Sequence, residues 1–110
     1  MNWHLVTYAD ENFVEQQKYL HQIHKEGFVH HPFNRKQLES TKFYKDNKKI
    51  LDQDKGAGWW LWKPYYILEV LKKSKTNDFI IYSDCGDMFS HGLKPYIETT
   101  LNDNDISLLL

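Results

Sequence analysis

The chain of 110 residues has room for one domain with a modest hydrophobic core. Hydrophobic residues make up 41% and charged residues 26%, which is typical of a folded globular protein and excludes a disordered chain. The formal net charge of −1 gives no reason to expect binding to nucleic acid or to an anionic membrane surface, so we expect no nucleic-acid partner.

Cysteine content and hydropathy indicate where the protein acts. Cys85 is the single cysteine, so no internal disulfide bond can form and a reducing compartment is expected. The start of the chain lacks the basic and apolar regions of a secretion signal, and no apolar run is long enough to span a bilayer. These features predict a cytoplasmic protein without a transmembrane segment.

The first quarter of the chain predicts a strand followed by a helix. A β-prone run at His4–Tyr8 leads into a helix over Glu11–Glu26, for which Asp10 is the expected N-cap and Gly27 the end. Three apolar residues at helical spacing predict its buried face: Phe13, Leu20 and Ile23.

The middle of the chain predicts a second strand and two helices. Phe28–His31 reads as a strand that Pro32 stops, and the polar stretch Arg35–Gln53 is expected to be helical, although its apolar residues make no clean stripe. A further helix is predicted from Pro64 to Lys73. Its expected buried side consists of Ile67, Leu68 and Leu71.

The last third predicts two more strands around a helix. Phe79–Ser83 (FIIYS) reads as a central parallel strand, Gly92–Leu101 as a helix and Ile106–Leu110 as another buried strand. The alternation predicts an α/β fold, a Rossmann-like, mostly parallel sheet with covering helices. Because the chain ends within an apolar run, residues 1–110 are expected to be the N-terminal part of a longer domain.

The segment Ser83–Asp87 follows the most β-prone run directly. Ligands of open α/β sheets bind beyond the carboxyl ends of the strands, so Ser83 and Asp84 are expected at the mouth of a site. Asp84 and Asp87 are close enough in a turn to share a divalent cation, which would neutralise a diphosphate leaving group. The alternative is that Asp84 only caps the turn and that Asp87 is exposed.

A second candidate segment, Gly56–Pro64, combines two glycines, three tryptophans and a lysine at the start of a predicted helix. Helix N-termini stabilise anions and Lys63 adds a positive charge, so a diphosphate is expected to bind here. Trp62, with Trp59 and Trp60, would wall a base or a sugar. The alternative is that the tryptophans fill the core beneath the sheet.

The end of the first predicted strand is a third candidate. A nucleotide-binding α/β domain receives the base and ribose at this position. Thr7 supplies a hydroxyl, Tyr8 a ring and Asp10 a hydrogen-bond acceptor. An Asp-capped turn is also expected in any fold of this class.

Histidines and the cysteine suggest two other chemistries. His21 and His24 are three residues apart on the predicted helix and close in sequence to His30 and His31, a pattern that zinc sites use. No carboxylate or thiol clearly completes that set. Cys85 lacks an identifiable base, so a buried structural thiol is preferred to a nucleophile.

Set in order, these segments resemble a known family. The run Gly58–Leu68 (GWWLWKPYYIL) followed by Asp78–Gly86 (DFIIYSDCG) is similar to the pattern G-(Y/W)-W-L-W-K-P … D-x-(I/L)-x-Y-x-D-(A/C)-G. That pattern occurs in bacterial and viral glycosyltransferases with the GT-A, or nucleotide-diphospho-sugar transferase, fold. Val6–Ala9 also suits the first strand of such domains, and the resemblance spans about the first hundred residues.

The resemblance implies binding of a nucleotide-diphosphate sugar and transfer of its sugar to a hydroxyl of a glycan or another acceptor. Lys63 matches the donor-binding Lys or Arg, and Asp84 matches the first Asp of an Asp-x-Asp motif that holds manganese or magnesium. Gly86 stands at the second Asp position, so Asp87 is the candidate replacement as catalytic and metal-binding residue. Because the acceptor site usually lies in the C-terminal half, this chain is expected to bind donor weakly or to be inactive alone.

Two other functions stay open. A non-catalytic carbohydrate-binding or interaction module predicts that Trp59, Trp60 and Trp62 form a solvent-facing platform far from Asp84. A phosphoryl-transfer enzyme with an Asp nucleophile, as in haloacid-dehalogenase-like folds, needs a second acid where Gly86 stands. The glycosyltransferase hypothesis instead requires Asp84 and Lys63 to face each other across one crevice.

Overall fold

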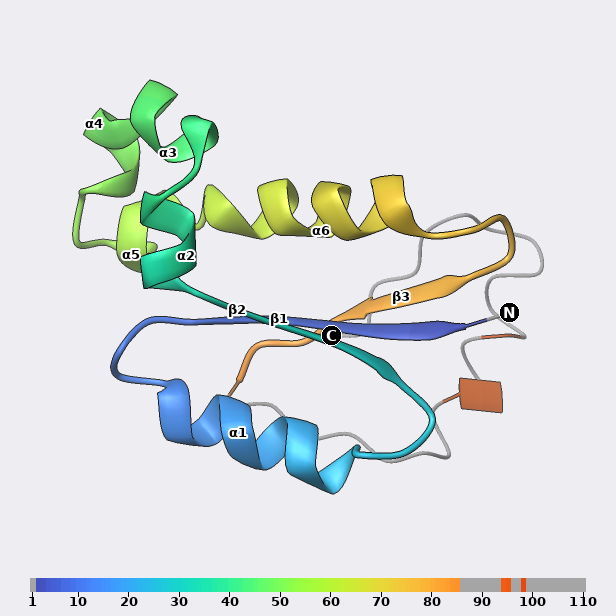
Figure 1. Cartoon of the computed structure of the whole chain (residues 1–110). Coiled ribbons are helices and arrows are strands. Elements are labelled where there is room, and N and C mark those ends of the chain that lie inside the picture. The colour runs from blue at the N-terminus through green and yellow to red at the C-terminus, as the bar shows by residue number, and fades with distance from the viewer. Residues whose placement is uncertain (1, 86–93, 96–97, 99–110) are drawn as a thin grey trace.

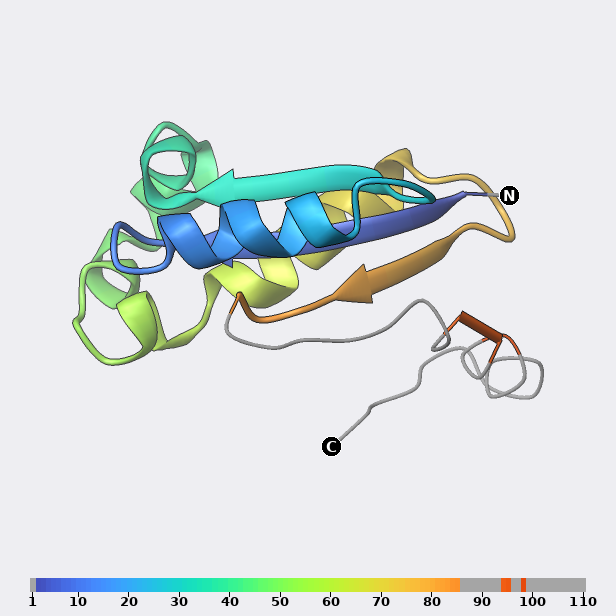
Figure 2. The same cartoon turned by 90° about the horizontal axis from the view of Figure 1, so that it is seen from below.

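The computed structural model of the chain describes residues 2–85, 94, 95 and 98. In this part the chain forms an open sheet of three parallel strands with helices on both faces, as Figure 1 and the turned view in Figure 2 show. The α/β class with a parallel sheet is therefore confirmed. The strand predicted at Ile106–Leu110 and most of the helix predicted at Gly92–Leu101 lie outside the described residues.

The middle strand of the described sheet is β1 (Trp3–Ala9), which pairs with β2 (Val29–Asn34) on one side and β3 (Phe79–Tyr82) on the other. All seven residues of β1 are buried because helices cover both of its faces. The third strand, predicted to be central, lies at one end of the described sheet, and the strand predicted to follow it lies outside the described residues. A continuous apolar run indicates that both faces of a strand are buried. It does not indicate how many neighbouring strands pair with that strand.

One face of the sheet is covered by α1 (Val14–Ile23) (Figure 1). The helix begins later than predicted, since the Asp10 side chain accepts the Asn12 N–H at 2.9 Å in a turn and Phe13 takes the N-cap position. Phe13 is 47% exposed, against the expectation that it is buried. The buried residues of α1 are instead Gln17 and Leu20.

β2 continues through Pro32 to Asn34, so the predicted stop at Pro32 is wrong. Among the described residues β2 pairs with no strand but β1, and a strand with one open side tolerates a residue without an N–H.

The single helix predicted over Arg35–Gln53 is three short ones: α2 (Arg35–Glu39), α3 (Lys42–Asp46) and α4 (Lys48–Leu51). Side-chain caps begin α2 and α3, whereas α4 follows Asn47 without a side-chain cap. Asn34 caps α2 in a reciprocal box with Gln37, and the Thr41 hydroxyl accepts the Tyr44 N–H at the start of α3.

The other face is covered by α6 (Trp62–Lys73), whose buried side differs from the predicted one. Leu68 and Leu71 are 46% and 54% exposed. Because α6 starts two residues before Pro64, its large rings face the sheet, where Trp62 stacks on Tyr8 and Tyr66 on Phe33. The core between α6, α2, α4 and the sheet contains Val6, Tyr8, Leu38, Leu51, Trp62, Tyr66 and Val70.

Candidate functional site

The carboxyl ends of all three described strands lie at one edge of the sheet because the strands are parallel. We call this the carboxyl edge. Figure 1 shows α2, the segment labelled α5 and the start of α6 at this edge, above the sheet. Open α/β sheets bind ligands at this position, so each predicted site residue is placed relative to it.

The carboxyl edge brings Lys63 and Asp84 into direct contact, whereas the glycosyltransferase hypothesis has them face each other across a crevice. Lys63 lies in the first turn of α6, Asp84 follows β3 by two residues, and Nζ is 3.3 Å from Oδ1. The ammonium is also 5.0 Å from the centre of the Tyr82 ring. Both charged side chains are partly exposed, at 34% and 57%. An ion pair this exposed contributes only about 0–1 kcal/mol to stability, so the fold does not depend on it.

Ser83 and Cys85, on either side of Asp84, have structural contacts. Ser83 is buried, its N–H donates to the Val6 carbonyl and its hydroxyl to the Asp84 carbonyl. The Cys85 thiol donates to the Tyr8 carbonyl at 3.2 Å. Burial, with the nearby charges of Asp84 and Asp10, raises the pKa of the Cys85 thiol to about 11, so it is a poor nucleophile at neutral pH.

The residues at the end of β1 point in different directions. Thr7 is fully buried on the α1 side, where its hydroxyl lies 2.7 Å from His21 Nε2 and accepts from the Gln17 amide. It is not presented to a ligand at the carboxyl edge. Tyr8 is buried on the α6 side. Asp10 reaches the edge itself, with one carboxylate oxygen on the Asn12 N–H.

The three tryptophans of the predicted segment divide between core and surface. Trp62 is 7% exposed and its ring centre lies 4.0 Å from that of Tyr8, so it is a core residue. Trp59 and Trp60 are each 48% exposed. The carbohydrate-binding alternative predicts that all three tryptophans face the solvent. That prediction is wrong for Trp62.

Residues 56–60, which include α5 (Gly56–Trp59), form a turn with left-handed backbone, here called the left-handed turn. Its five φ angles are 60° at Gly56, 48° at Ala57, 103° at Gly58, 57° at Trp59 and 56° at Trp60. Each non-glycine residue in this region costs about 1–3 kcal/mol, and such strain is found mainly at binding and active sites. A Cβ at Gly58 would lie 2.6 Å from backbone atoms of Leu51.

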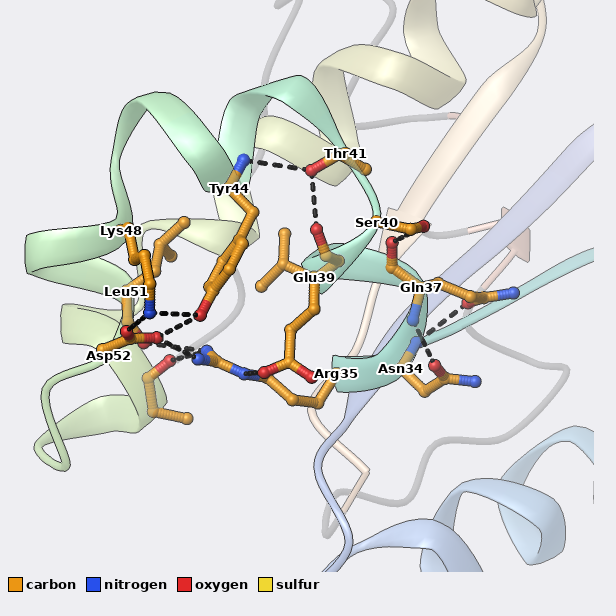
Figure 3. Close-up of polar contacts among 12 residues, drawn as sticks. Asn34, Arg35, Gln37, Glu39, Ser40, Thr41, Tyr44, Lys48, Leu51 and Asp52 are labelled. Atoms are coloured by element: carbon orange, nitrogen blue, oxygen red, sulfur yellow. Dashed lines mark hydrogen bonds and ion pairs between the residues drawn. The ribbon is translucent and has the colours of Figure 1, made fainter.

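Arg35, the single arginine of the chain, holds the left-handed turn in place (Figure 3). Its Nη1 donates to the carbonyls of Leu51, at 2.8 Å, and Ala57, at 3.4 Å. Nη2 pairs with Asp52 at 3.0 Å and Nε with Glu39 at 3.4 Å. The guanidinium thus joins α2, the end of α4 and the turn. Sequence reasoning missed it, because the carbonyls that it contacts lie 16 and 22 residues further along the chain.

A cavity of about 760 Å³ opens at the carboxyl edge between the β1–α1 loop, α2 and the segment that leads to the left-handed turn. Its volume falls in the range of small-molecule sites, about 300–1,000 Å³. Lys63 and Asp84 are not part of its wall. The wall is acidic, because two basic residues, Arg35 and Lys36, face five carboxylates. Those carboxylates are Asp10, Glu11, Glu39, Asp52 and Asp54.

The described residues do not form a metal site. Within them no group of three or more His, Cys, Asp or Glu is placed to hold a metal ion. Asp84 is paired with Lys63, and Asp87 lies outside the described residues. The available donor set does not fit manganese or magnesium, so binding of either ion stays a prediction.

The histidines proposed for zinc are engaged with one another and with the protein. His21 Nδ1 is 2.7 Å from His30 Nδ1, while its Nε2 contacts Thr7. On the α6 face of the sheet, His4 lies between His31 and Asp78, at 2.8 Å and 3.0 Å. These ring nitrogens make hydrogen bonds that a metal would have to replace.

No family model, curated protein or solved structure matches this chain. In the part of the chain that the structure describes, no helix is both long enough and apolar enough to cross a bilayer. Functional inference therefore depends on the chemistry of the carboxyl edge.

Proposed function

We propose that this chain is the donor-binding part of a glycosyltransferase and binds a nucleotide-diphosphate sugar at the carboxyl edge. The observation that supports this most directly is the ion pair between Lys63 and Asp84. These two residues come from different elements and meet where open α/β sheets bind ligands.

Lys63 is the group suited to the diphosphate. It lies at the start of the 12-residue helix α6, where the helix dipole adds to its positive charge. The Tyr82 ring beneath the ammonium favours a cation at this position. When the bond between the sugar and the diphosphate breaks, negative charge grows on the leaving oxygen, and a fixed ammonium there lowers the barrier electrostatically.

Asp84 has a complementary role. Its carboxylate accepts hydrogen bonds from hydroxyl groups of the ribose or the sugar, and it pairs with Lys63 when no anion is bound. Because both side chains are partly exposed, a diphosphate can replace the carboxylate on Lys63 at a cost of about 1 kcal/mol or less.

The acidic cavity complements this arrangement. A diphosphate would be repelled by its carboxylates, whereas the hydroxyl groups of a nucleoside or a sugar are donors that carboxylates accept. Asp10 lines the cavity and directly follows β1, the strand that pairs with β3. We assign the ribose hydroxyls to Asp10 and the diphosphate to Lys63.

Titration calorimetry with UDP, GDP and their sugars, with and without manganese, tests the proposal. Lys63→Ala removes the cation and is expected to weaken binding by about tenfold or more. Asp84→Asn is expected to weaken it as well. Lys72→Ala is the matched control, because Lys72 is exposed on the same helix and pairs with Glu69. A folded protein that binds none of these nucleotides would refute the donor site.

A further inference from the structure

Trp60 presents a half-exposed ring at the carboxyl edge. A Cβ on Gly56 would lie 2.4 to 2.7 Å from three atoms of the Trp60 ring, so the indole lies face-on over this glycine. The side chain is still 48% exposed. Among the described residues, no ring or cation covers the second face, and none accepts a hydrogen bond from the indole N–H. The turn thus holds an aromatic ring that is half exposed and whose indole N–H has no acceptor among the described residues.

The other two tryptophans of the segment are already occupied. Lys55 Nζ lies 4.9 Å from the Trp59 ring, and the Trp59 N–H donates to the Gln53 side chain. Trp62 is in the core, and its N–H donates to the Gly56 carbonyl at 3.1 Å. These contacts fix the left-handed turn and leave Trp60 as the ring that a ligand can reach.

The residues that precede Trp60 in the chain indicate the chemistry of that ligand. The acidic cavity begins on the same turn, at Ala57, and includes the exposed side chains of Gln53 and Asp54. Such a surface disfavours an anion and offers acceptors to hydroxyl groups. The Trp60 carbonyl accepts the Lys63 N–H at 3.0 Å, so the ring is one turn of backbone from the proposed diphosphate site.

We propose that Trp60 is the stacking platform for a pyranose ring of the acceptor, and that the acceptor is therefore a saccharide. The C–H face of the sugar packs on the indole ring, while its hydroxyls bind the indole N–H, Asp54 and Gln53. The role as acceptor site rests on the proposed glycosyltransferase function, but the binding of saccharide does not.

Binding of neutral oligosaccharides without nucleotide tests this site. A panel of hexasaccharides of glucose, galactose and N-acetylglucosamine is titrated into the 110-residue chain, its Trp60→Ala and Trp60→Phe variants, and Tyr19→Ala. Tyr19 is the control because it is an aromatic residue, 58% exposed, on α1 across the sheet. Alanine and tryptophan bear a similar left-handed backbone penalty at position 60, so the strain is little changed.

We expect at least one hexasaccharide to bind, Trp60→Ala to weaken it about tenfold or more, and Trp60→Phe to retain part of the affinity. Tyr19→Ala should bind like the parent chain. The proposal is overturned if no oligosaccharide binds or if Trp60→Ala binds equally well. A dimer in sedimentation velocity that Trp60→Ala abolishes would overturn it too, because the face would then serve self-association.

Nucleotide titrations on the same samples separate this inference from the proposed function. Nucleotide binding without oligosaccharide binding would remove the acceptor platform and leave the donor site intact. Oligosaccharide binding without nucleotide binding would refute the donor site while supporting Trp60 as a saccharide platform.

Discussion

The two ends of the sheet use polar residues in opposite ways. At the amino ends of the strands, Asp78 accepts the N–H groups of Asn2 and Lys75 and pairs with His4. These hydrogen bonds hold the pKa of Asp78 well below its usual range. The N–H of Lys75 makes the largest contribution and His4 the second largest. His4 in turn contacts His31. The polar groups there satisfy one another.

At the carboxyl edge, by contrast, charged and aromatic side chains are partly exposed to solvent. The left-handed turn holds three non-glycine residues at positive φ, two tryptophans are half exposed, and Lys63 and Asp84 form an ion pair that the fold does not need. The comparison teaches that the amino ends serve stability, while the strained and open carboxyl edge has the features of a binding site.

The largest expected effect on stability comes from a matched pair of glycine substitutions, one at each end of the sheet. Gly58→Ala places a methyl group 2.6 Å from the Leu51 backbone at φ 103°, so we expect it to lower the free energy of unfolding by about 3 kcal/mol or more. At Gly27, before β2, φ is 83° and the nearest atom is the flexible end of Lys94.

Gly27→Ala should therefore lower the free energy of unfolding by only about 1–2 kcal/mol. Urea unfolding followed by circular dichroism measures both variants. Equal losses would mean that the turn at the carboxyl edge is no more constrained than the turn before β2.

The second effect is a loss of stability in acid that originates from the histidine pairs. His21 and its partner His30 join α1 to the amino-terminal half of β2. Burial, with the charges of His30, His31 and His24, lowers the pKa of His21 from 6.5 to about 4. The unfolded chain therefore takes up this proton first, and stability that is complete above pH 6.5 falls as the pH drops toward 4.

Because His21 is only half buried, we expect its share of this loss to be about 1–2 kcal/mol. Urea midpoints between pH 4 and pH 7 for the parent chain and His21→Gln provide the measurement. A pH dependence that is identical in the two proteins would show that His21 is not the group responsible.

The smallest expected effect on stability is that of Trp60→Ala. The side chain is half exposed, so its removal should change the free energy of unfolding by about 0.5 kcal/mol or less. Thermal unfolding of the two proteins checks this. A loss of several kcal/mol would show that Trp60 belongs to the core and would weaken the contrast between the two ends.

The sequence predicted the features of this fold that are local or repeat along the chain. Three strands, their parallel arrangement and the helix through Lys73 follow from hydrophobic patterning, and the meeting of Lys63 with Asp84 follows from the resemblance together with the rule on strand ends. The α6 face was predicted wrongly because apolar and aromatic residues surround that helix, and only packing decides that Trp62, Tyr66 and Val70 are buried.

The parts of the site that could not be predicted depend on contacts across the chain. Arg35 contacts carbonyls that are 16 and 22 residues away, and no local pattern indicates such a pairing. The left-handed turn places Ala57, Trp59 and Trp60 at φ angles that these residue types rarely adopt, so their identity does not indicate it.

The most direct test of the account is the ratio of dissociation constants for UDP and GDP between Lys63→Ala and Lys72→Ala, measured by calorimetry at neutral pH. Both variants lose one lysine of α6, but only Lys63 lies at the carboxyl edge beside Asp84. We predict that at least one nucleotide binds the Lys72 variant as it binds the parent chain and binds the Lys63 variant about tenfold more weakly. Equal affinities in the two variants would contradict the assignment of a donor site to Lys63 and Asp84.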